Sequence, residues 1–273
     1  MDNYLSYKIN NTDEILLALL TQFDFESFEE NEDHFLGYIN AEFVTEEIKN
    51  DIHDTITNYE NTTYQVSEIE PQNWNALWEA SFQPVVVNSF CQVRADFHPA
   101  LPDINYDIVI NPKMAFGTGH HATTYMMIDQ MSAIDFEGKS VFDFGCGTGI
   151  LAILAAKMGS QDVDAVDIEI ESFQNTIENA AINNTPWIKS VHGILEDMDP
   201  KIYDIILANI NRNILTRYAP ALSKITATNG VLLLSGILNE DQSLVIDAFA
   251  EVGFTQVKTQ QRDGWKCIRM IKN

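Results

Sequence analysis

A glycine-rich segment, Ser140-Val-Phe-Asp-Phe-Gly-Cys-Gly-Thr-Gly149, contains the most informative residues of the chain. Its GxGxG turn, with Gly145 and Gly147, lies between an apolar run typical of a buried strand and a helix predicted to begin near Ile150. Glycine allows a sharp turn and a close approach of ligand to backbone, and the first N–H groups of the helix point at that ligand. About 20 residues further on, Asp167 ends the next apolar run, where a carboxylate can accept hydrogen bonds from both hydroxyls of a ribose. The segment therefore predicts a site for a nucleoside-containing cofactor.

The residues around the turn indicate which cofactor this is. A dinucleotide fingerprint, GxGxxG, requires its third glycine at position 150, which is Ile. Asp143, two residues before the first glycine, would repel a pyrophosphate but could pair with the ammonium group of a methionine moiety. DxGxGxG followed by a distal acid resembles the S-adenosylmethionine loop of class I methyltransferases. The alternative is a structural strand–helix turn that binds no ligand.

A second segment with candidate binding residues is Asn111-Pro-Lys-Met-Ala-Phe-Gly-Thr-Gly-His-His-Ala-Thr-Thr124. Its Gly-Thr-Gly turn leads into a helix whose N–H groups, together with the hydroxyl of Thr123 or Thr124, could face the carboxylate of the methionine moiety. Either threonine could instead be an N-cap or first-turn residue. His120 and His121 are candidates for a base or a pocket wall, and for His120 a structural role is favoured.

The run Leu207-Ala-Asn-Ile-Asn211 ends the fourth predicted strand of the same unit. In class I enzymes this position meets the methyl acceptor. The amide of Asn209 could accept a hydrogen bond from an amine and aim its lone pair at the methyl carbon, and orientation supplies much of the rate of an in-line displacement. It could also hold the sulfonium end of the cofactor, or cap the strand. We take Asn209 as the catalytic residue and as a cofactor contact.

Strands and helices are predicted to alternate from residue 122 onward, which indicates an α/β, doubly wound, mostly parallel seven-stranded sheet with the ligand at the carboxyl ends of its strands. The predicted strands are Ser140–Phe144, Gln161–Asp167, Ile188–His192, Tyr203–Ala208, Gly230–Ser235, Thr255–Lys258 and Lys266–Ile271. The predicted helices are Ala122–Ser132, Ile150–Met158, Ile170–Asn183, Arg212–Ile225 and Asp241–Val252. Three short strands, Val85–Val87, Cys91–Phe97 and Tyr106–Ile110, are expected to form an antechamber to this domain, which spans residues 85–273.

Residues 1–70 are predicted to form a separate small domain with the order βαββαβ, the ferredoxin-like α+β pattern. Its first helix is expected over Thr12–Phe23, with Thr12 or Asn11 as N-cap and with Ile15, Leu16, Leu19 and Leu20 on one face. Because it contains no catalytic constellation, we interpret it as a recognition module. Residues 71–84 should form a linking helix in which Trp74 and Trp78 pack together.

Charge is unevenly distributed along the chain. The 273 residues carry a net charge of −24, and residues 1–70, with 17 acidic and 2 basic side chains, account for −15 of it. This excess argues against direct contact with nucleic acid and suits a basic partner, although solubility or a salt-adapted host would also explain it.

The remaining composition bears on location and cofactors. No apolar run reaches the roughly 18 residues of a membrane span. Three scattered cysteines, Cys91, Cys146 and Cys267, suggest a reducing, cytoplasmic location without disulfides, and no cluster has metal-ligand spacing. Cys146, inside the glycine turn, is interpreted as a packing residue rather than a nucleophile. The sequence leaves the oligomeric state open, and we take a monomer as the expectation.

The three segments together, in this order and spacing, resemble the ribosomal protein L11 methyltransferase family. The resemblance covers nearly the whole chain and includes the linker Asn73-Trp-Asn-Ala-Leu-Trp-Glu-Ala-Ser-Phe-Gln-Pro84 and the late Ser235-Gly-Ile-Leu238. It implies methyl transfer from S-adenosylmethionine to lysine ε-amines and the N-terminal α-amine of large-subunit ribosomal protein L11, typically to the trimethyl state. It also implies that the acidic small domain recognises this substrate. The cofactor contacts implied by the motifs are Thr124, Gly145, Asp167 and Asn209, to which the residues themselves add Asp143 and Gly147.

Two departures from the family pattern stand out. The chain has His120-His121-Ala122 where the family usually has Thr-His-Pro, and Ile210-Asn-Arg-Asn213 where it usually has Ile-Leu-Ala-Gly. Two alternatives stay open: a class I methyltransferase that acts on another protein, a small molecule or an RNA base, and a non-catalytic S-adenosylmethionine-binding protein. The acidic charge speaks against RNA, the additional domain against a minimal small-molecule enzyme, and the combination of Asp143, Asp167 and Asn209 against a non-catalytic protein.

Overall fold

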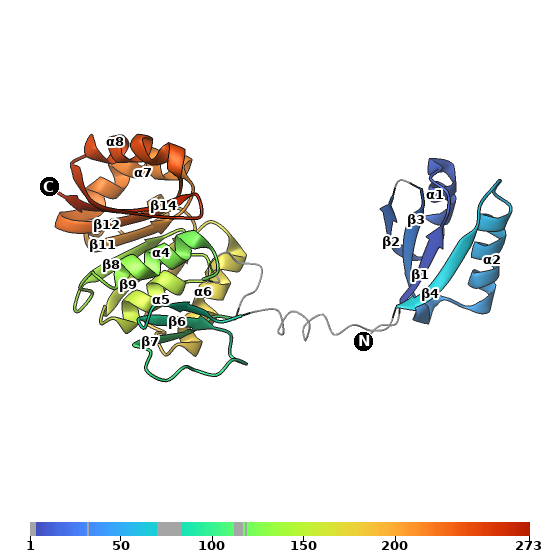
Figure 1. The fold of residues 1–273 in the computed structure, drawn as a ribbon, viewed down its shortest axis with the longest axis horizontal. Coiled ribbons are helices and arrows are strands. Elements are labelled where there is room, and N and C mark those ends of the chain that lie inside the picture. Colours follow the sequence, from blue (N-terminus) through green and yellow to red (C-terminus); the bar gives the residue numbers. More distant parts are fainter. Residues whose placement is uncertain (1–3, 32, 70–82, 112–116, 118) are drawn as a thin grey trace. The chain divides into compact units, whose positions relative to one another are not determined.

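The structure is a computed structural model that describes residues 4–31, 33–69, 83–111, 117 and 119–273. It divides into two compact units, Met1–Ser81 and Phe82–Asn273, which are described separately (Figure 1). The predicted linking helix over 71–84, with Trp74 and Trp78, lies outside the described residues except for its last two positions.

The first unit is a four-stranded antiparallel sheet with the order β2-β3-β1-β4. Its elements are β1 (Tyr4–Ile9), α1 (Glu14–Leu20), β2 (Phe25–Glu30), β3 (Phe35–Asn40), the short turn η1 (Ala41–Phe43), α2 (Glu46–Thr57) and β4 (Tyr64–Ile69). Both helices pack on the same face of the sheet, because Leu16 of α1 and Ile52 of α2 share one apolar core with Tyr7 and Ile39. This is the ferredoxin-like arrangement that the element order predicts.

The first helix of this unit is shorter than predicted. Asp13, rather than Thr12 or Asn11, is its N-cap and accepts a hydrogen bond from the N–H of Ile15 at 2.8 Å. Asn11 instead accepts from the N–H of Asp13 at 2.8 Å, which turns the chain before the helix begins.

The prediction of one apolar face on α1 is wrong for two of its four residues. Leu16 and Leu20 are buried, whereas Ile15 is 65% exposed and Leu19 is 38% exposed. A helix of two turns lying on a small sheet presents little more than one i,i+4 pair to it.

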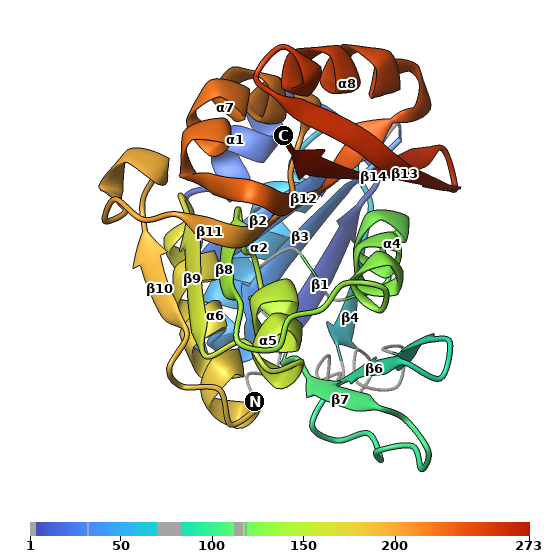
Figure 2. The same ribbon diagram turned by 90° about the vertical axis from the view of Figure 1, so that its left-hand side faces the viewer.

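The second unit contains a seven-stranded sheet with the order β10-β9-β8-β11-β12-β14-β13 (Figure 2). Its strands are β8 (Ser140–Phe144), β9 (Asp162–Asp167), β10 (Lys189–His192), β11 (Tyr203–Asn209), β12 (Thr226–Leu238), β13 (Phe254–Arg262) and β14 (Trp265–Lys272). The first five of the spatial order run parallel, and β14 is antiparallel to both of its neighbours. Strands β12 and β13 are longer than predicted because both keep pairing with β14, out to Leu238↔Trp265 and Arg262↔Trp265.

Helices cover both faces of this sheet. They are α4 (Ala122–Met131), α5 (Ile150–Lys157), α6 (Ile170–Ile182), α7 (Arg212–Ile225) and α8 (Gln242–Ala250). One core joins α4 and α5 to residues such as Val141 and Leu207, and a second joins α7 and α8 to Phe142 and Ala208, the next residue along each strand. Consecutive residues of β8 and β11 thus face opposite cores, as a doubly wound sheet requires.

A smaller sheet precedes this one in the chain. Strand β5 (Val85–Val87) pairs antiparallel with β6 (Cys91–Arg94), and β6 pairs in parallel with β7 (Tyr106–Val109). The predicted strand over Cys91–Phe97 ends early, where Arg94 forms a two-pronged contact with Asp107, at 2.8 and 2.9 Å.

The order of strands defines where a ligand can bind. After β8 the chain builds outward through β9 and β10, and then returns to place β11 on the other side of β8. The loops that follow β8 and β11 therefore lead away from each other and leave a crevice at the carboxyl ends of these two strands.

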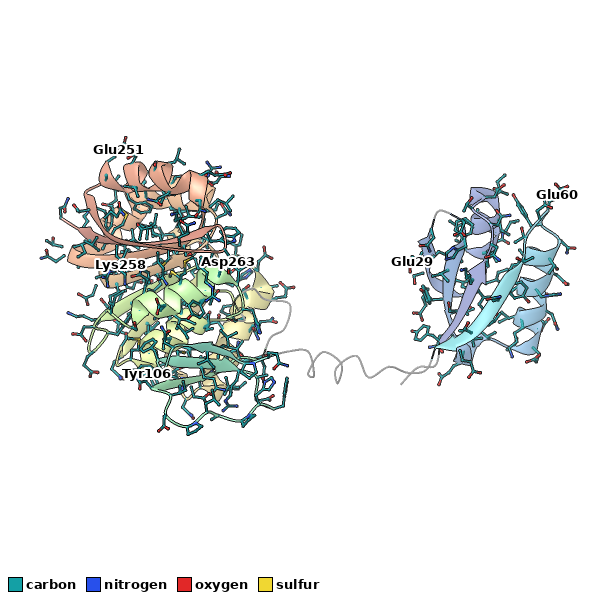
Figure 3. The ribbon with its side chains drawn as sticks, viewed as in Figure 1. Glu29, Glu60, Tyr106, Glu251, Lys258 and Asp263 are labelled. Atoms are coloured by element: carbon teal, nitrogen blue, oxygen red, sulfur yellow. The ribbon has the colours of Figure 1, made fainter. Side chains whose placement is uncertain are left out.

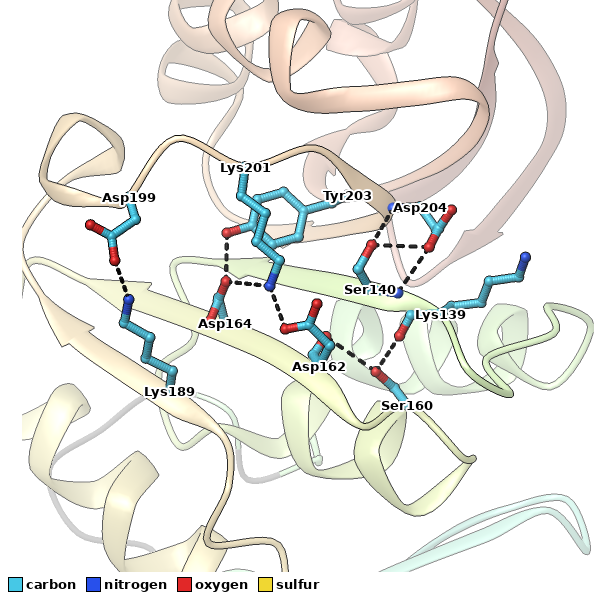
Figure 4. Close-up of polar contacts among 10 residues, drawn as sticks. All are labelled: Lys139, Ser140, Ser160, Asp162, Asp164, Lys189, Asp199, Lys201, Tyr203 and Asp204. Carbon is cyan, nitrogen blue, oxygen red and sulfur yellow. Dashed lines mark hydrogen bonds and ion pairs between the residues drawn. The ribbon is translucent and has the colours of Figure 1, made fainter.

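The opposite, amino-terminal ends of the strands are joined by polar contacts instead (Figure 4). The buried carboxylate of Asp164 accepts hydrogen bonds from the hydroxyl of Tyr203 at 2.7 Å and from the ammonium of Lys201 at 2.9 Å, and Lys201 also contacts Asp162. The pair Lys189–Asp199, 2.6 Å apart, lies near this cluster but is exposed.

This cluster generates a stability prediction. Tyr203→Phe should lower the free energy of unfolding by about 1–2 kcal/mol, because a buried carboxylate loses one of its two donors. Lys189→Met should change it much less, because solvent screens the exposed pair, and serves as the control. Urea unfolding measures both, and equal effects would contradict a structural role for the buried contact. Cofactor affinity should stay unchanged in both variants, because the cluster lies at the edge of the sheet away from the crevice.

Candidate active site

A cavity of about 790 Å³ opens at the carboxyl ends of β8, β9, β10 and β11. Each of the four strand ends contributes to its wall, through Gly145, Asp167, Gly193 and Asn209 respectively, and Thr124 of α4 completes it. The cavity thus occupies the crevice that the strand order creates.

The glycine turn forms the floor of this cavity. The N–H groups of Gly145 and Cys146 both donate to the carbonyl of Val166 in β9, at 2.9 and 3.1 Å, which ties the turn to the neighbouring strand. Gly145 has φ = +76°, and a Cβ there would lie 2.3 Å from Cγ2 of Ile210. Only glycine satisfies both conditions, so the turn is closely packed from behind and open toward the cavity.

Asp167 lies at the tip of β9, as predicted. Its Oδ2 accepts a hydrogen bond from the N–H of Gly147 at 2.8 Å, and its Oδ1 accepts from the N–H of Glu169 at 3.0 Å. The two backbone donors fix the carboxylate at the cavity wall, and each oxygen keeps a further lone pair. This geometry fits a ligand with two adjacent hydroxyls, such as a ribose.

Asp143 lies deeper than a direct cavity contact would. It is buried, it does not line the cavity, and its Oδ2 accepts from the N–H of Ala152 in the first turn of α5 at 3.1 Å. Its Oδ1 has no hydrogen-bond partner among the described residues. Burial raises the pKa of this carboxyl to about 7, the N–H of Ala152 opposes that rise, and the charge of Asp167 adds to it.

Asn209 at the end of β11 contacts Thr124 of α4. Its Nδ2 donates to the hydroxyl of Thr124 at 3.3 Å, and its Oδ1 is buried and has no partner among the described residues. In the register of the sheet, Asp143 lies beside Leu207, two residues before Asn209 on the adjacent strand. Two unpartnered acceptors, from Asp143 and Asn209, therefore lie on neighbouring strand ends, an arrangement suited to an ammonium or amine.

Residues of the second predicted segment have different roles: some line the cavity and others stabilise the start of α4. Thr124 lines the cavity, whereas the N–H of Thr123 donates to Nδ1 of His121 at 3.3 Å, so that His121 is the N-cap of α4. His120 contacts the carbonyl of Gln83 at 2.8 Å. Neither histidine lines the cavity, so neither occupies the place of a base.

The rest of this segment connects directly to the glycine turn. The hydroxyl of Thr148 donates to the carbonyl of Gly117 at 2.6 Å, which brings Gly117 against the cofactor loop. Residues 112–116 and 118 lie outside the described residues. Cys146 is buried, lies 3.3 Å from the hydroxyl of Thr176, and has a pKa raised by burial, which agrees with a packing role.

Several cavity residues were not predicted from the sequence. They include the apolar residues Ile168, Ile194, Ile210, Ile214 and Tyr218, which come from three separate strand ends and from α7. The one available signal was Gly193-Ile194, which follows β10 as Gly145 follows β8. Among the described residues there is no group of three or more His, Cys, Asp and Glu side chains that could hold a metal ion.

The residues fit S-adenosylmethionine in three respects. Asp167 matches a ribose, the unpartnered Oδ1 of Asn209 at the cavity wall, with the buried carboxyl of Asp143 on the adjacent strand, matches an ammonium, and the apolar strand-end residues match a nucleobase. The strand order, with antiparallel β14 between β12 and β13, is that of the class I methyltransferase sheet. The fold and this cavity together define a class I methyltransferase that uses S-adenosylmethionine.

Comparison with known proteins narrows this class. The model of the family "Ribosomal protein L11 methyltransferase (PrmA)" matches residues 7–273. The chain is 40% identical over 265 residues to the ribosomal protein L11 methyltransferase of Porphyromonas gingivalis, covering 94% of this chain and 89% of that protein. It is 37% identical to the ribosomal protein L11 methyltransferase of Chlorobaculum parvum, and the match covers 92% of this chain and 90% of that protein. The chain therefore belongs to the ribosomal protein L11 methyltransferase family.

A solved structure agrees with this assignment. The crystal structure of ribosomal protein L11 methylase from Lactobacillus delbrueckii subsp. bulgaricus is 29% identical and superposes with a TM-score of 0.64, covering 70% of this chain and all of that one. No helix within the described parts of the chain has the length and apolar character needed to cross a membrane.

The geometry of Asp167 predicts its contribution to cofactor binding. Asp167→Ala should weaken binding of S-adenosylmethionine by about 1–3 kcal/mol, because charge-assisted hydrogen bonds to the ribose hydroxyls are lost. Isothermal titration calorimetry measures the change. Asp162→Ala, at the other end of the same strand, is the matched control and should bind normally. An unchanged dissociation constant for Asp167→Ala would remove this residue from the site.

The raised pKa of Asp143 predicts a pH dependence. Below about pH 7 the free enzyme holds this carboxyl protonated, and pairing with an ammonium requires its carboxylate. Cofactor binding should therefore release a proton and tighten as the pH rises toward about 7. The free energy of unfolding changes in the opposite direction. Because the pKa of Asp143 in the folded protein lies above the ordinary 3.8, its stabilising proton is lost, and stability falls, as the pH rises through about 7.

Calorimetry in two buffers of different ionisation enthalpy, at about pH 6 and about pH 8, measures this proton release. In Asp143→Asn the release should disappear and binding at the higher pH should weaken. Equal proton release in both proteins would assign it to another group.

Proposed function

We propose that this enzyme transfers methyl groups from S-adenosylmethionine to lysine ε-amines and to the N-terminal α-amine of the large-subunit ribosomal protein L11. The observation that carries the proposal is the extent of the family match, since relatives named for that substrate cover 94% of this chain, including the small acidic unit. The substrate protein is a ribosomal component, so we place the reaction in the cytoplasm.

The site supports an amine as acceptor. When bound, S-adenosylmethionine supplies an electrophilic methyl group on a sulfonium. The acceptor amine must be neutral to attack it, and its lone pair must lie in line with the carbon–sulfur bond that breaks. The unpartnered Oδ1 of Asn209 can accept an N–H of that amine, while Thr124 holds the other end of the amide. An amine that loses its proton to solvent before it binds needs no histidine base, and neither histidine of the segment Asn111–Thr124 lines the cavity.

The small unit supports a basic protein substrate. Residues 1–70 carry −15 of the net charge, and side chains such as Glu29 and Glu60 point away from the core of the unit (Figure 3). None of the cavity residues comes from this unit. We infer that it recognises the acceptor protein and leaves the chemistry to residues 85–273. The same negative charge disfavours direct contact with ribosomal RNA.

The direct test is the intact mass of ribosomal protein L11, purified from methylation-deficient cells, before and after incubation with enzyme and cofactor. We expect mass increases in steps of one methyl group. Deletion of residues 1–70 should abolish this methylation and leave cofactor affinity unchanged, since each unit has its own apolar core. A truncated enzyme that methylates at the full rate would place recognition elsewhere, and an unchanged mass with the full-length enzyme would refute the substrate.

Asn209 should act mainly in the transition state. Asn209→Ala is expected to lower the maximal rate more than it weakens acceptor binding, because alignment of the amine is realised chiefly there. Asn209→Asp should instead shift the pH optimum upward, because a carboxylate holds the amine in its protonated, unreactive form. Comparison of the two pH–rate profiles tests this. Full rate with reduced cofactor affinity in Asn209→Ala would leave Asn209 as a cofactor contact alone.

A further inference from the structure

Helix α6 has a partly inverted polarity: several polar residues face inward, and isoleucines as well as glutamates are exposed. Its buried side chains are Ser172, Asn175, Thr176, Asn179 and Ala180. The large apolar residues of this helix lie on its solvent side, where Ile170 is 40% exposed, Ile177 is 48% exposed and Ile182 is 43% exposed. A helix on the surface of a globular protein ordinarily has the opposite arrangement.

The inward polar residues have a structural explanation. Asn179 accepts from the N–H of Asn111 at 3.2 Å and donates to the carbonyl of Thr148 at 2.9 Å. Asn183, just after the helix, both accepts from the N–H and donates to the carbonyl of Val109, at 2.9 and 2.6 Å. These asparagines satisfy the backbone that leaves strand β7 and the backbone of the glycine turn. They account for the inner face, and leave the outer face unexplained.

The outer face begins at the cavity. Ile168, which is 63% exposed, Glu169 and Glu171 line the cavity, and Ile170 lies between the two glutamates in sequence. Ile177 follows Ile170 by seven residues and so lies on the same side of the helix. Trp187, 45% exposed, follows the C-terminal end of the helix. We call Ile170 and Ile177 the α6 outer face.

We propose that the α6 outer face is a docking surface for the acceptor protein, and that it contacts an apolar surface patch surrounded by lysine or arginine. This inference rests on the proposed function and adds where the acceptor is held. Apolar side chains at this level of exposure favour burial by a partner. Because Ile168, Glu169 and Glu171 at the start of α6 line the cavity, a protein that lies on this face reaches the cavity wall.

Charge selects a basic protein over a second copy of this chain. Exposed carboxylates at Glu169 and Glu171 accompany the apolar residues, and the chain as a whole carries −24. Two copies meeting through this face would bring these carboxylates together, which is unfavourable, whereas a basic surface is attracted to them.

The experiment compares Ile177→Lys with Ile177→Glu in the full-length enzyme. Both substitutions remove the apolar contact at an exposed position and both residues favour helix, so the fold should be retained. Only lysine also repels a basic partner. We expect the KM for ribosomal protein L11 to rise by about tenfold or more for Ile177→Lys and by clearly less for Ile177→Glu. The kcat and the dissociation constant of S-adenosylmethionine should remain unchanged.

The matched control is Ile202→Lys, at an exposed isoleucine just before β11, at the edge of the sheet away from the cavity. It should leave the KM unchanged. An unchanged KM in both Ile177 variants would overturn the proposal, and equal increases would overturn the basic partner. A wild-type dimer that either Ile177 variant dissociates, seen by sedimentation velocity, would assign the face to a second copy instead. If the wild-type enzyme neither binds nor methylates ribosomal protein L11, the proposed function itself fails, and this inference fails with it.

Discussion

The site depends on one close contact, between Ile210 and two glycines from the flanking strands. A Cβ on Gly145 would lie 2.3 Å from Cγ2 of Ile210, and a Cβ on Gly236 would lie 2.3 Å from its carbonyl oxygen. Ile210 directly follows Asn209, so its backbone sets where the amide of Asn209 points. The ends of β8, β11 and β12 can thus come together only because both neighbours lack a side chain. This explains why Gly236, which packs against the backbone of Ile210, belongs to the functional core.

Two of the polar groups in this region are left without partners in the described structure. The Oδ1 atoms of Asp143 and Asn209 are both buried and unpartnered, an arrangement that costs free energy in the unliganded protein. The cost is recovered when a ligand supplies N–H donors, so the same feature that destabilises the free site favours binding. At the other edge of the sheet, the buried carboxylate of Asp164 has two donors. Stability and function are in this sense separated along the strands.

Recognition and chemistry are also separated. The cofactor cavity lies entirely in the larger unit, and most of the negative charge lies in the smaller one. The α6 outer face adds an apolar component on the larger unit, close to the cavity. An acidic module and an apolar face next to the reacting groups would select different properties of one acceptor, its charge and its surface shape.

The sequence determined the reaction class and most of the fold, because the signals for these are local. The glycine turn, Asp167 at a strand tip and the alternation of strands and helices each depend on neighbouring residues. The structure confirmed β8 and α7 at their predicted bounds and the other strands of the large sheet within a few residues, except for β12 and β13. The length of those two strands depends on pairing with β14, a contact between residues distant in sequence, which local patterns do not contain.

Tertiary structure decided the roles of individual side chains. Thr123 and Thr124 are adjacent and identical in type, and only the direction of α4 places one against the N-cap His121 and the other in the cavity. The depth of Asp143, and hence its raised pKa, follows from the covering of β8 by helices on both faces. The partly inverted polarity of α6 arises because its asparagines satisfy backbone groups from β7 and the glycine turn. Burial and long-range hydrogen bonds are properties of the packed chain, so no single segment of sequence could specify them.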